Sequence, residues 1–80
     1  MSMLTQIIGY VQTNSDSTTV LDTQFFLNVD LYGNWIIEKY VKSGDQDGVS
    51  TFSKGSKDIG GNWLNRVSLT YVDWNDLYSS

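Results

Sequence analysis

The sequence predicts an all-β protein: a small antiparallel meander, barrel or sandwich of about five strands, formed by residues 1–80 as a single domain. The chain contains no Ala and no Pro and only one Glu, whereas nineteen residues are Val, Ile or Thr, which favours a pleated surface over a helix. Apolar and polar residues alternate in several stretches. Eighty residues, 40% of them hydrophobic, are enough for one core and too few for two.

The first expected strand runs from Leu4 to Val11 and carries apolar residues on both faces, which is typical of a strand covered on two sides. Gly9 interrupts this strand and is expected to mark a bulge or a bend. Residues 13–19 are almost entirely polar, so they predict a loop between the first strand and the second.

The clearest strand pattern lies between Val20 and Tyr32, with polar residues such as Asn28 on one face. The opposite face carries Phe25, Leu27, Val29 and Leu31. Gly33-Asn34 then predicts a turn, and a further strand follows from Trp35 to Lys42.

Two registers are open for this hairpin. A two-residue turn at Gly33-Asn34 would continue the apolar face of the first strand with Ile36 and Glu38, and would therefore bury a Glu. A loop of odd length, for example residues 33–35 with a bulge, aligns that face with Ile37, Lys39 and Val41 instead. The odd loop sets Asp30 opposite Glu38, so each register has a cost.

The second half of the chain predicts two more strands. Residues 43–48 have the composition of a turn, and a short strand follows from Val49 to Ser53. Residues 54–62 predict a polar loop, and the last strand is expected from Trp63 to Val72. The tail from Asp73 to Ser80 is expected to be an extended edge or a single helical turn.

The acidic residues are concentrated in the first half of the chain. Residues 1–38 contain four acids and no base, and the net charge of the whole chain is -4. Such a field repels phosphate, so we expect no nucleic-acid binding through a basic patch. No apolar run reaches the ~18 residues that cross a bilayer, so no membrane association is expected, and the cytoplasm is the expected compartment, of the host if the protein is viral.

Most catalytic chemistry lacks its usual residues here. The absence of Cys and His removes thiolate and imidazole nucleophiles together with the common zinc ligands. No nucleophile elbow, P-loop or dinucleotide-binding glycine pattern occurs. We therefore expect a non-enzymatic protein without a cofactor.

Aromatic residues make up 14% of the chain, which is more than a core of this size needs. Exposed Trp and Tyr on a β surface are typical of protein interfaces. The leading hypothesis is therefore a small binding protein, of the inhibitor or viral accessory type, that engages a partner protein through an acidic, aromatic-rich surface. Its candidate partner-binding residues are Asp22, Asp30, Trp35, Tyr40 and Trp74. A homodimer is a further expectation, because small β domains have exposed edges.

The last quarter of the chain carries a family resemblance. From Asp58 to Val72, a Trp, an Asn, a base, an apolar residue and a Ser lead into an expected strand, and this order resembles the end of a βγ-crystallin Greek key, although Leu64 and Leu69 replace polar residues of that pattern. Asn75 to Ser80 is similar to the calcium-binding signature of the same family. The resemblance implies an alternative function, a Ca²⁺- or carbohydrate-binding module. Its metal ligands would be Asn65, Ser68, Asn75, Asp76 and Ser79.

Overall fold

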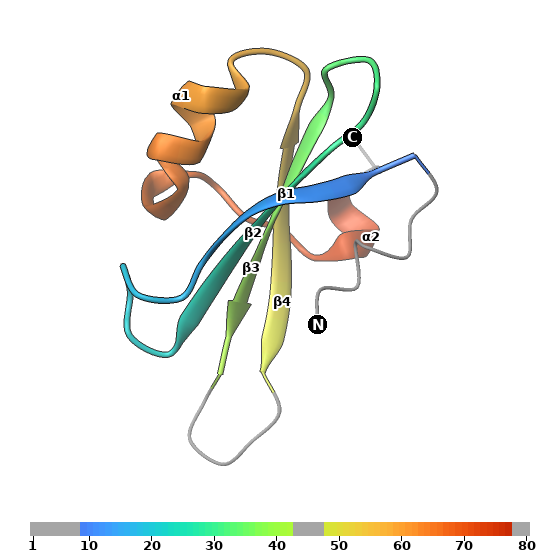
Figure 1. Cartoon of the computed structure of the whole chain (residues 1–80). Helices are drawn as coiled ribbons and strands as arrows, with labels where there is room; N and C mark the ends of the chain where they lie inside the picture. Colours follow the sequence, from blue (N-terminus) through green and yellow to red (C-terminus); the bar gives the residue numbers. More distant parts are fainter. Residues whose placement is uncertain (1–8, 43–47, 78–80) are drawn as a thin grey trace.

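The computed structural model describes residues 9–42 and 48–77, which form one open four-stranded antiparallel sheet followed by short helical turns (Figure 1). The strands lie in chain order as a meander. They are β1 (Val11–Asp16), β2 (Thr23–Val29), β3 (Trp35–Val41) and β4 (Val49–Gly55). The helical turns are α1 (Ile59–Leu64), the 3-10 helix η2 (Arg66–Ser68) and α2 (Trp74–Leu77). The antiparallel meander is confirmed, whereas the barrel, the sandwich and the fifth strand are wrong for the described residues.

The β2–β3 hairpin takes the odd-loop alignment. Leu27 lies opposite Ile37 and Phe25 opposite Lys39, so the two strands pair the faces that the second of the two open alternatives paired, in a register shifted from it. The loop is longer than expected: it comprises residues 30–34, and the Asp30 amide donates to the Asn34 carbonyl at 3.0 Å. Leu31 therefore lies in the turn, 95% exposed, rather than on the apolar face.

Both faces of the sheet are covered, each by a different part of the C-terminal segment. On one face, Phe25 and Ile37 form a cluster against which Ile59 and Trp63 of α1 pack. On the other face, Ile36 and Phe52 form a cluster with Leu77 of α2. Figure 1 shows α1 and α2 on opposite sides of the sheet. Because both faces are buried in this way, Glu38 is buried as well, opposite Phe26 rather than Asp30.

The strand expected from Trp63 to Val72 is wrong. Ile59 and Trp63 are four residues apart, a spacing that places both on one side of a helical turn, and both pack on the sheet. Leu69 and Tyr71, whose alternation predicted the strand, pack on the same cluster from an irregular segment. Only Val72 pairs with the sheet, through a bridge to Phe52. Of the two forms left open for the tail, an extended edge or a single helical turn, the described residues take the helical turn, as α2.

The first strand also differs from the expectation. Most of the stretch from Leu4 to Val11 lies outside the described residues, and the loop expected over 13–19 is wrong for residues 13–16, which belong to β1. A bulge between Gln12 and Asn14 interrupts its pairing with β2. Nearly all of β1 is exposed, so its sequence carries no apolar alternation that could have revealed a strand.

Candidate functional site

A groove opens between the β1–β2 turn and the adjacent ends of β2 and β3. It has a volume of about 510 Å³, and its walls include Ser17, Leu21, Asp22, Gln24, Tyr40 and Lys42. We call it the Tyr40 groove. Leu21 is 88% exposed at this groove, which is unusual for a large apolar side chain. The groove therefore combines one acid, one base, one aromatic ring and one exposed aliphatic group.

Tyr40 has a fixed position in the groove. Its hydroxyl accepts a hydrogen bond from the Gly48 amide at 3.0 Å. A Cβ atom on residue 48 would collide with the Tyr40 ring, so only glycine allows the ring to lie this close to the chain. Gly48, which directly precedes β4, thus holds the ring that lines the groove.

A smaller hollow of about 160 Å³ adjoins the groove, because Gln24 and Tyr40 line both. Phe26 and Glu38 complete its lining. Glu38 is 2% exposed, and its carboxylate accepts a hydrogen bond from the Ser50 hydroxyl at 2.7 Å. The two hollows therefore place a second carboxyl group close to the Tyr40 ring.

The β1–β2 turn, which forms one wall of the groove, is held by Asp16. Oδ1 of Asp16 accepts hydrogen bonds from the amides of Thr18 at 3.0 Å and Thr19 at 3.3 Å, a local arrangement that Asp side chains favour in turns. Asp22 ends the same turn in the left-handed region, with a φ of 56°, and its carbonyl accepts a hydrogen bond from the Lys42 amide at 2.9 Å. The turn is thereby tied to β3.

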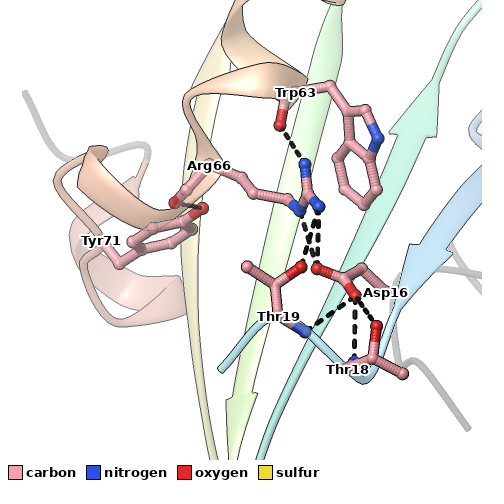
Figure 2. A network of polar contacts seen from close by, with 6 residues as sticks. All are labelled: Asp16, Thr18, Thr19, Trp63, Arg66 and Tyr71. Atoms are coloured by element: carbon pink, nitrogen blue, oxygen red, sulfur yellow. Dashed lines mark hydrogen bonds and ion pairs between the residues drawn. The ribbon is translucent and has the colours of Figure 1, made fainter. Parts of the chain in front are cut away.

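Arg66 connects this turn to the C-terminal segment (Figure 2). Its Nε and Nη2 atoms both donate to Oδ2 of Asp16, at 3.1 and 2.8 Å. Nη1 donates to the Trp63 carbonyl at 2.7 Å, and the guanidinium lies 4.4 Å from the centre of the Trp63 ring. Both side chains of the ion pair are largely buried. Arg66 therefore stabilises the turn that forms the groove wall, and it is not itself a lining residue of the groove.

The same network changes two pKa values. Hydrogen bonds from Thr19, Thr18 and Arg66 hold the pKa of Asp16 far below its ordinary value of 3.8. Burial raises the pKa of Tyr71 far above its ordinary value of 10.0, and the Tyr71 hydroxyl donates to the Arg66 carbonyl at 2.7 Å. Asp16 therefore stays ionised and Tyr71 neutral over the ordinary pH range.

The structure brings together only two of the five predicted partner-binding residues, Asp22 and Tyr40. Asp30 lies in the β2–β3 turn, where its carboxylate accepts hydrogen bonds from the amide and the side chain of Asn34 at 2.9 and 2.8 Å. Trp35 is 4% exposed, and its indole donates to the Lys57 carbonyl at 2.9 Å, so its choice as an exposed aromatic is wrong. Trp74 packs edge-to-face on Phe52.

The predicted calcium ligands do not form one cluster in the described parts of the chain. The Asn65 side chain donates to the Gly61 carbonyl at 2.9 Å, and the Ser68 hydroxyl donates to the Asn65 carbonyl at 3.0 Å. Asn75 and Asp76 lie exposed in α2, and Ser79 is outside the described residues. No group of three His, Cys, Asp or Glu that could hold a metal ion occurs in residues 9–42 and 48–77.

Sequence reasoning missed several residues of the site. Leu21 precedes an Asp in a turn, and only its exposure in the folded chain distinguishes it from a core residue. Gln24 was not singled out, and Glu38 was considered only as a cost in the two hairpin registers, so neither was expected to line a hollow. The partnership of Asp16 with Arg66 spans 50 residues, and no local pattern reveals it.

Comparison of the chain with protein-family models, with curated proteins and with solved structures finds no match. Within the described residues, no helix has the length and hydrophobicity that crossing a bilayer requires.

Proposed function

We propose that this chain is a non-enzymatic binding protein that engages a partner protein through the Tyr40 groove. One observation carries the proposal: Asp22 and Tyr40, selected as partner-binding residues from separate parts of the sequence, line the same open groove beside the exposed Leu21. Tyrosine is enriched among the residues that contribute most to protein interfaces, and an exposed aliphatic side chain beside it gives a partner apolar surface to cover. Because the chain has neither His nor Cys, recognition rather than catalysis is the proposed role.

The charges of the groove favour a partner surface with at least one basic group. Two acids line the two hollows, Asp22 in the groove and Glu38 in the adjoining hollow, whereas Lys42 is the one base among their lining residues. The net charge of -4 adds a long-range attraction for a basic partner. An apolar side chain of that partner would cover Leu21, and a basic one would approach Asp22.

Capture from host extract tests the proposal if it compares matched variants. The wild-type chain and the variants Leu21→Asn and Asp22→Asn are immobilised, and the bound proteins are identified by mass spectrometry. Asn tolerates the left-handed conformation of residue 22, so Asp22→Asn removes the charge without straining the turn. Asp73→Asn removes the same charge from an exposed residue beside α2 and serves as the control.

A partner that acts through the groove is captured by the wild type and by Asp73→Asn. Leu21→Asn is expected to weaken its binding about tenfold, as for a central interface residue. Asp22→Asn is expected to reduce mainly the association rate and its dependence on salt. If every captured protein binds the two groove variants as tightly as the wild type, the groove is not the binding site.

A further inference from the structure

The two outer edges of the sheet differ in how they are covered. On β4, the Phe52 amide donates to the Val72 carbonyl at 2.7 Å, and the Val72 amide donates back at 2.9 Å. On β1, the backbone pairs only with β2 among the described residues. The edge of β4 is therefore occupied at its middle, whereas no described residue pairs with the outer edge of β1.

The backbone alternation shows which groups β1 presents at this edge. The Asp30 amide donates to Asn34 and the Lys42 amide to Asp22, so even-numbered residues of β2 bond to β3 and odd-numbered ones face β1. Asn14 and Asp16 lie opposite the odd-numbered Leu27 and Phe25. The amides and carbonyls of Ser15, and of Gln12 beyond the bulge, consequently point away from the sheet.

The usual protection of an edge strand is largely missing here. Natural edges are blocked by Lys, by Pro or by inward-pointing charges, and residues 11–15 contain none of these. The bulge between Gln12 and Asn14 bends the first half of β1, but Asn14–Asp16 pair regularly with β2. The one charge of the strand, Asp16, is neutralised by Arg66 at 2.8 Å.

We propose that β1 pairs antiparallel with β1 of a second copy of the chain, so that the two sheets join across a two-fold axis. A second copy fits this edge because self-pairing opposes no like charges. When Gln12 of one copy meets Ser15 of the other, Val11 lies opposite Asp16. The outward amides and carbonyls of both strands then satisfy one another.

The apolar ends of β1 favour the same arrangement. Leu31 and Tyr32, which are 95% and 88% exposed, lie in the turn that follows Val29, and Val29 is opposite Val11. The exposed Leu21 lies in the turn at the other end of β1. Because the two β1 strands run in opposite directions, the Leu31–Tyr32 turn of one copy and Leu21 of the other copy lie at the same end of the joined sheet.

The test measures the mass of the purified chain in solution by size-exclusion chromatography with light scattering, from micromolar to millimolar concentration. We expect the mass to approach twice the 9.0 kDa of one chain. Ser15→Pro removes an outward amide without removing a bond to β2, and Ser15→Lys adds a charge to the edge. Each variant is expected to raise the dissociation constant of the dimer about tenfold or more, because a two-fold dimer contains the substitution twice and so loses two hydrogen bonds or gains two charges.

Asn75→Lys, which adds the same charge on the exposed side of α2, is the control and is expected to dimerise like the wild type. A circular dichroism spectrum of each variant verifies that it is folded, and Ser15→Lys decides the matter if Ser15→Pro unfolds. A wild-type chain that stays monomeric at millimolar concentration would overturn the proposal, as would a dimer that tolerates Ser15→Lys unchanged. Since mass is measured without any partner protein, this proposal and that of the Tyr40 groove can fail separately.

Discussion

Asn28 in β2 provides the sharpest test of how the sheet is packed. Its side chain is 0% exposed, and its Oδ1 atom has no hydrogen-bond partner among the described residues. Its Nδ2 atom donates only to the Phe26 carbonyl, at the long distance of 3.5 Å. Asn28 lies opposite Ile36, which belongs to the cluster that α2 covers. A polar amide is thus buried in an apolar layer with little compensation.

Replacing this amide with an apolar group of the same shape is expected to stabilise the protein. A buried polar group without a partner costs about 1–3 kcal/mol, and Asn28→Leu removes that cost while keeping the branching of the side chain. For a domain of 60–100 residues, 1 kcal/mol corresponds to about 4–8 °C in Tm, so Tm is expected to rise by at least about 4 °C. Thermal and urea unfolding followed by circular dichroism measure the change.

Two further variants separate the causes. Asn28→Asp has the same size but places a charge at the same site, and it is expected to destabilise the fold strongly. Asn28→Val is smaller and retains the gain even if Leu is too large for the space. If both Asn28→Leu and Asn28→Val melt at or below the wild-type temperature, the buried amide is compensated and the reasoning is wrong.

The remaining predictions concern the contacts that hold the C-terminal segment on the sheet. Arg66→Gln is expected to lower Tm by several degrees, because it breaks the contact with Asp16, whereas Lys57→Gln in the exposed loop leaves Tm unchanged; equal effects would contradict this. Trp35→Phe loses the bond to the Lys57 carbonyl and is expected to reduce the free energy of unfolding by at least about 1 kcal/mol in urea titrations; an unchanged value would show that the bond adds nothing. Because the pKa of Tyr71 is raised in the folded state, the stabilisation that its neutral hydroxyl gives to the fold is complete below pH 10.0 and is lost as the pH rises above 10.0. Tyr71→Phe is expected to make Tm depend less on pH in this alkaline range. Because the pKa of Asp16 is lowered in the folded state, the stabilisation that its carboxylate gives to the fold is present above pH 3.8 and is lost as the pH falls below 3.8. An Asp16→Asn variant whose Tm falls with acid in the same way as that of the wild type would contradict this.

Calcium gives a separate check on the family resemblance. The described candidate ligands Asn65 and Ser68 already donate hydrogen bonds to carbonyl groups of their own helical turns. A Ca²⁺ site would stabilise the folded state through linkage, so the alternative function predicts a higher Tm in millimolar Ca²⁺. The same melt with millimolar Mg²⁺ is the control, and equal Tm values with and without Ca²⁺ would remove the alternative.

Local patterns were sufficient for the centre of the sheet and insufficient for its borders. The alternation of Phe25, Leu27 and Val29 predicted β2 and its apolar face, because a covered strand must place its apolar residues on every second position, whereas the choice of Ile37 over Ile36 as the neighbour of that face came from the structure. The same rule missed β1, whose exposed residues have no reason to alternate. It also predicted a strand at Leu69 and Tyr71, where an irregular segment packs the same side chains on the sheet.

The candidate site shows the same division. Asp22 and Tyr40 could be selected from the sequence by residue type, and Trp35 by the same criterion proved to be buried. Whether an aromatic ring lies in the core or at a groove depends on which segments cover it. That covering is decided here by α1, α2 and the Arg66 contacts, which join residues far apart in the chain.

The sequence by itself determined a β-rich fold, a central antiparallel hairpin, an acidic first half and a chemistry without Cys or His. Only the tertiary structure decided that the C-terminal segment covers both faces of the sheet, that the outer edge of β1 has no partner among residues 9–42 and 48–77, and that Asp22 and Tyr40 line one groove. The physical reason is that periodicity reports burial along one segment, whereas coverage, edges and grooves arise from contacts between segments that no local pattern encodes.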